Sequence, residues 1–72
     1  DEISQADVPR VFDALMTAGA RKDTQTIIEL LKVAASLGDK ARGFEGYVKA
    51  FSDYPFEPVR KEAQNALNRI KS

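Results

Sequence analysis

Residues 24–38 read TQTIIELLKVAASLG, and this stretch decides the fold. Its apolar side chains recur at helical spacing, without the alternation of a strand. Asp23 or Thr24 can cap a helix here, and Gly38 is suited to end one. We therefore predict a helix over 24–37. At 100° per residue its apolar surface covers about 220°, so this helix needs neighbours on two sides.

The preceding segment predicts a helix over 8–18. Asp7 can cap it, Pro9 suits its first turn, and Gly19 is placed to end it. Its apolar stripe is nearly as wide as that of the following helix, and any surface that the other helices leave uncovered would face another chain or a further segment of the same protein. The apolar residues of this stripe are Val8, Val11, Phe12, Leu15 and Met16.

Two further helices are predicted on the C-terminal side, over 40–51 with Asp39 as a cap and over 58–70 with Pro58 as the first residue. The link between the second and third helices is very short, which favours an antiparallel hairpin. The prediction is an all-α fold, a small four-helix domain of two antiparallel helical hairpins, with residues 1–72 forming one domain.

The composition indicates that the chain has no enzymatic activity. It contains no histidine and no cysteine, which removes the usual general base and the commonest nucleophile and metal-ligand arrangements. Asp7, Asp23 and Asp39 each precede an apolar run, as helix caps do. We therefore expect no catalytic residues, no cofactor and no metal, and we predict that the chain is not an enzyme.

The sequence contains no apolar run near the length of about 18 residues that a membrane span needs, and no signal-peptide pattern. The chain begins with Asp1 instead of Met, so we expect a processed chain or a piece of a longer one. The compartment stays open, with the cytoplasm as the default expectation.

Aromatic residues supply the candidate surface for a protein partner. In the helix over 40–51 they recur at i, i+3 and i+7, which suits either core packing or a peptide-binding groove. Two more flank Pro55 in the following loop, where they would either cover the end of the bundle or contact a partner. The candidate partner-binding residues are Phe44, Tyr47, Phe51, Tyr54 and Phe56.

Gly43 and Gly46 interrupt the same helix. A Gly-x-x-Gly loop clamps nucleic acid in KH domains, but that fold needs strands, and nothing in this sequence resembles one. We expect the two glycines to lie on one helix face and allow a neighbour to approach closely, with local helix distortion as the alternative. Each costs about 1 kcal/mol relative to alanine, so this helix should be the least stable.

Basic side chains on the last helix give an alternative function, the binding of nucleic acid. The formal net charge is zero, whereas proteins that bind phosphates usually carry a basic excess. Exposure to solvent is the simpler explanation of these side chains. The candidate contacts are Arg60, Lys61, Arg69 and Lys71, joined by Lys40, Arg42 and Lys49.

Residues 53–70 read DYPFEPVRKEAQNALNRI and resemble the second half of a HEAT repeat. In that repeat an Asp and a Pro in the turn precede Val-Arg, and Ala, Ala-Leu and Ile follow at helical steps. The resemblance covers about a third of the chain. It implies a helical scaffold that binds proteins and carries no catalytic residues. The leading prediction is therefore a protein-interaction or structural helical module, either part of a longer protein or an oligomerising unit.

Overall fold

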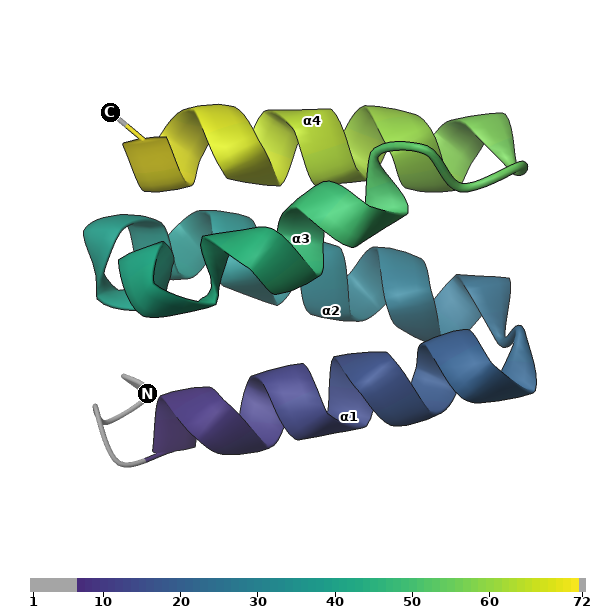
Figure 1. Cartoon of the computed structure of the whole chain (residues 1–72), viewed down its shortest axis with the longest axis horizontal. Helices are drawn as coiled ribbons and strands as arrows, with labels where there is room; N and C mark the ends of the chain where they lie inside the picture. Colours follow the sequence, from purple (N-terminus) through teal and green to yellow (C-terminus); the bar gives the residue numbers. More distant parts are fainter. Residues whose placement is uncertain (1–6, 72) are drawn as a thin grey trace.

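The computed structural model describes residues 7–71, and every regular element among them is helical (Figure 1). This confirms the all-α class. Short turns separate some of these helices, and others follow one another directly. In chain order they are α1 (Val8–Arg21), α2 (Thr24–Leu37), the 3₁₀-helix η2 (Gly38–Phe44), α3 (Glu45–Phe51) and α4 (Glu57–Lys71).

Helix α2 lies at the centre of the fold and has the predicted bounds. Asp23 caps it: the carboxylate accepts a hydrogen bond from the Thr26 backbone N–H at 3.4 Å and from the Thr26 hydroxyl at 2.7 Å. Helix α2 packs against α1 on one side and against α4 on the other. Its wide apolar surface is therefore covered largely within the chain, because two neighbours bury it from opposite sides.

The prediction of four helices in two hairpins is wrong. Residues 24–51 are helical throughout, because η2 follows α2 directly and α3 follows η2 directly. Counted as continuous segments, residues 7–71 contain three helices, and the middle one is sharply bent. The predicted helix over 40–51 is instead the end of this segment, since Gly38 at φ 58° redirects the chain and tighter 3₁₀ turns follow it.

Helix α1 runs to Arg21, three residues beyond the predicted end. Gly19 does not end it, because Lys22 adopts the left-handed conformation, at φ 58°, that closes the helix. Gly19 instead packs against the ring of Phe51. The predicted cap at Asp7 is also wrong: its side chain makes no capping hydrogen bond, and one carboxylate oxygen lies 3.9 Å from the guanidinium of Arg10.

The core of the described chain is entirely apolar, with no buried polar or charged residue. Every helix contributes to it, although η2 contributes only Ala41. Helix α4, one residue longer at each end than predicted, packs on α2, η2 and α3. The largest fully buried side chains are Phe12, Leu15, Ile27, Leu31, Ile70, Val8, Val48 and Val59.

Candidate functional site

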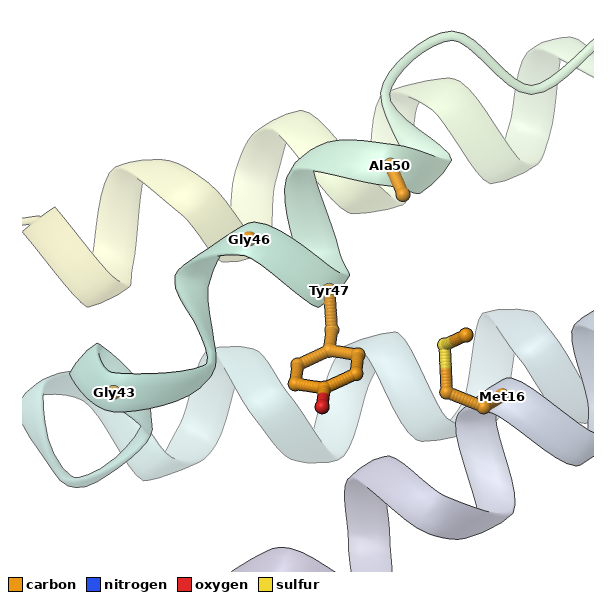
Figure 2. A pocket seen from close by; sticks show the side chains of 5 residues that line it. All are labelled: Met16, Gly43, Gly46, Tyr47 and Ala50. Atoms are coloured by element: carbon orange, nitrogen blue, oxygen red, sulfur yellow. The ribbon is translucent and has the colours of Figure 1, made fainter.

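An open pocket of about 320 Å³ lies between α1 and the η2–α3 segment. Met16 reaches it from α1, and Tyr47 faces it from α3 (Figure 2). Gly43, Gly46 and Ala50 complete the lining, and we call this surface the Met16–Tyr47 pocket. Apolar atoms and small residues make up most of its wall, so its chemistry suits an apolar ligand group.

Aromatic rings from α1 and from the η2–α3 segment pack against one another beside the pocket. Phe12 and Phe44 stack with ring centroids 4.7 Å apart and planes within 5°. The Tyr47 ring is tilted relative to both of these rings, and its centroid lies 6.2 Å from that of Phe12 and 5.8 Å from that of Phe44. Beside this cluster the described residues leave Met16 48% exposed.

Met16 and Tyr47 are exposed large apolar side chains, at 48% and 43%, and they lie at the same pocket. Met16 therefore belongs to the part of the wide apolar stripe of α1 that the other described helices leave exposed. Tyr47 was predicted as a candidate contact, whereas Met16 was not. The sequence signal that could have identified Met16 is its position at the edge of an apolar stripe that is wider than a lone hairpin can cover.

The two glycines of the pocket do not admit a close neighbour, so the expectation of helix approach is wrong within this chain. A Cβ added to Gly43 or Gly46 would meet nothing within 4 Å. Neither residue has positive φ. The close approach occurs at Gly19, where an added Cβ would lie 2.9 Å from the Phe51 ring.

The other predicted aromatic contacts divide between core and surface. Phe51 is buried, and Tyr54 is half-buried with its ring centroid 5.8 Å from that of Phe51. Phe56 is 45% exposed and lies outside the Met16–Tyr47 pocket. The five predicted aromatic residues therefore do not form one surface.

The basic residues of α4 are engaged with neighbouring groups. The Arg60 guanidinium donates a hydrogen bond to the Tyr54 carbonyl at 2.9 Å. The Lys61 ammonium lies 3.2 Å from a carboxylate oxygen of Glu57, and the Lys71 ammonium lies 3.7 Å from a carboxylate oxygen of Glu45. Arg69 also has an interaction partner and lines a separate pocket of about 190 Å³ between α2 and α4.

Within residues 7–71, no group of three or more acidic side chains is placed to hold a metal ion. No buried side-chain nitrogen or oxygen of this part of the chain lacks a hydrogen-bond partner. None of the helices described is long and apolar enough to cross a membrane. Among the described residues that line the Met16–Tyr47 pocket, only Tyr47 has a polar side chain, a hydroxyl.

The chain matches no protein-family model, no curated protein and no solved structure. The resemblance of residues 53–70 to a HEAT repeat therefore stays a prediction that rests on those residues. The functional argument rests on the geometry of the pocket.

Proposed function

We propose that this chain is a protein-interaction module, and that an apolar side chain of a partner protein binds in the Met16–Tyr47 pocket. The observation that carries the proposal is the joint exposure of Met16 and Tyr47 at the mouth of an apolar pocket. Methionine adapts its shape to different partners, and tyrosine is enriched in protein interfaces.

The small residues of the pocket support the same function. Gly43, Gly46 and Ala50 have little or no side chain, so a partner backbone could approach η2 and α3 closely. The two glycines serve no packing contact within the chain, yet each weakens its helix by about 1 kcal/mol relative to alanine. Contact with a partner would account for glycine at both positions.

Binding of nucleic acid is the weaker alternative. Phosphate binding needs cationic groups that can exchange counterions for phosphates. The formal net charge is zero, and Lys61 and Lys71 lie beside carboxylates whose negative charge would oppose phosphate. Catalysis has less support still, because no second polar group accompanies Tyr47 at the pocket.

Photo-crosslinking in cells tests the proposal. A photoreactive amino acid replaces Met16 in one variant and Asn68, an exposed residue of α4, in a control variant. We expect a discrete crosslinked protein from position 16 that is absent from position 68. Adding Gly46→Leu to the position-16 variant should remove this product, because the leucine side chain would fill the pocket. Absence of a product from position 16, or equal products from both positions, would refute the proposal.

A further inference from the structure

The α2–η2 and η2–α3 junctions have no linker, unlike the other two junctions of the described chain. Lys22 and Asp23 separate α1 from α2, and residues 52–56 separate α3 from α4. Between α2 and η2 there is no linker: helices of 14, 7 and 7 residues follow one another directly. The reversal of direction seen in Figure 1 is therefore made inside a helical segment.

Gly38 makes this reversal possible. Its φ of 58° and ψ of −128° form a combination that side chains strongly disfavour. If Gly38 took ordinary helical angles and η2 became α-helical, residues 24–51 would form one helix about 40 Å long. The longest dimension of the folded chain is 30 Å. A straight helix would therefore separate the two halves of the chain, α1–α2 and η2–α3–α4.

The contacts between these halves are of a kind that a second copy can supply. Helix α2 packs against α4 across the hinge, and the core that they share is apolar. The ion pairs described above lie within one half or the other: Asp7–Arg10 in the first, Glu57–Lys61 and Glu45–Lys71 in the second. Apolar packing has no directional requirement beyond shape, so identical packing can form between chains.

We propose that this chain forms an exchanged dimer with a second copy of itself, in which Gly38 straightens and each α1–α2 half packs on the η2–α3–α4 half of the other chain. The dimer would keep the packing between α2 and α4, now between two chains, and replace two bends with two straight helices. Each Met16–Tyr47 pocket would then combine Met16 of one chain with Tyr47 of the other. The exchange does not depend on the proposed partner.

Glycine at position 38 sets the balance between monomer and dimer. Alanine would strain the bent form and favour the straight helix. If alanine favours the straight form by about 1.4 kcal/mol at one hinge, the equilibrium constant of that hinge changes tenfold. The dimer contains two hinges, so its association constant should rise about a hundredfold. The formal net charge of zero adds no general repulsion between copies.

Sedimentation equilibrium of the wild-type chain, Gly38→Ala and Gly46→Ala tests the hinge. We expect Gly38→Ala to dimerise at far lower concentration than the other two proteins. Gly46→Ala is the matched control, because it improves helix propensity at a residue that is helical in both forms. A folded Gly38→Ala that remains as monomeric as the wild type would overturn the proposal.

Engineered cysteines test the exchange itself, and the chain has no natural cysteine to interfere. Ser36 on α2 and Asn65 on α4 line the same pocket across the two halves. Ser36→Cys and Asn65→Cys chains of different mass are unfolded together, refolded at high concentration and oxidised. Exchange predicts an excess of the disulfide that joins the two variants over disulfides between like chains.

This second measurement also decides the matter if Gly38→Ala fails to fold, because both cysteine variants keep Gly38. A statistical mixture of disulfides would overturn the proposal. Dimers of Gly38→Ala that give no excess of the mixed disulfide when the same two cysteines are placed in that variant would overturn it too, since they would show association through an outer surface.

Discussion

Replacing Gly19 by alanine sets a gain in helix propensity against a steric overlap. The added Cβ would lie 2.9 Å from Cζ of Phe51 and 3.1 Å from Cε1, whereas ordinary contact begins near 3.4 Å. The ring must retreat by about half an ångström, although it is buried and packed against Tyr54. Overpacking of this kind costs about 1–3 kcal/mol, and the helix gains about 1 kcal/mol.

We therefore expect Gly19→Ala to lower the free energy of unfolding by about 1 kcal/mol, and the melting temperature by about 4–8 °C. Urea unfolding followed by far-ultraviolet circular dichroism gives this value directly. Gly46→Ala is the matched control, because its Cβ meets nothing within 4 Å. It should stabilise the chain by about 0.5–1 kcal/mol.

Phe51→Leu tests whether overlap with the Phe51 ring causes the loss of stability in Gly19→Ala. The shorter side chain makes room for the new methyl group, so the double variant should lose about 1 kcal/mol less than the sum of the two single changes. If Gly19→Ala stabilised the chain as much as Gly46→Ala does, or if the two changes were additive, the proposed overlap would be refuted.

Three further predictions concern the core, the cap and the pocket. Leu31→Ala, a fully buried change on α2, should cost about 2–5 kcal/mol in chemical unfolding, close to the whole stability of so small a domain. Asp23→Ala should cost about 1 kcal/mol through loss of the cap on α2, while Asp39→Ala, at a residue that caps no helix, should change the same measurement by less than about 0.5 kcal/mol. Met16→Lys should leave the urea midpoint nearly unchanged yet weaken binding to the purified partner that crosslinking from position 16 identifies; a large loss of stability would show that Met16 serves the core.

The sequence predicts α2 completely, because its cap, its apolar pattern and its terminal glycine agree. Helix α1 is predicted too short, since a glycine that ends a helix and a glycine that admits a neighbouring ring look alike in the sequence. Gly19 is of the second kind. Hydrophobic periodicity also cannot separate an α-helix from the 3₁₀ turns after Gly38, which tertiary packing selects.

The candidate site was predicted only in part, for a related reason. Aromatic spacing identifies Tyr47, but it does not show which of the five aromatic rings face inward. That depends on the direction in which the bent segment returns across α1. Met16 lies at the edge of an apolar stripe, and only the position of α3 decides that the side chain stays exposed.

The central position of α2 has a consequence during synthesis of the chain. The ribosome releases α1 and α2 first, and these helices can form within microseconds. The face of α2 that packs on α4 must then wait about 2–7 seconds for the remaining residues, at the usual rate of elongation. During this interval a neighbouring nascent chain on the same messenger could offer its own α4. Polysome density, and not only the concentration of the finished protein, would then govern how many chains emerge in pairs.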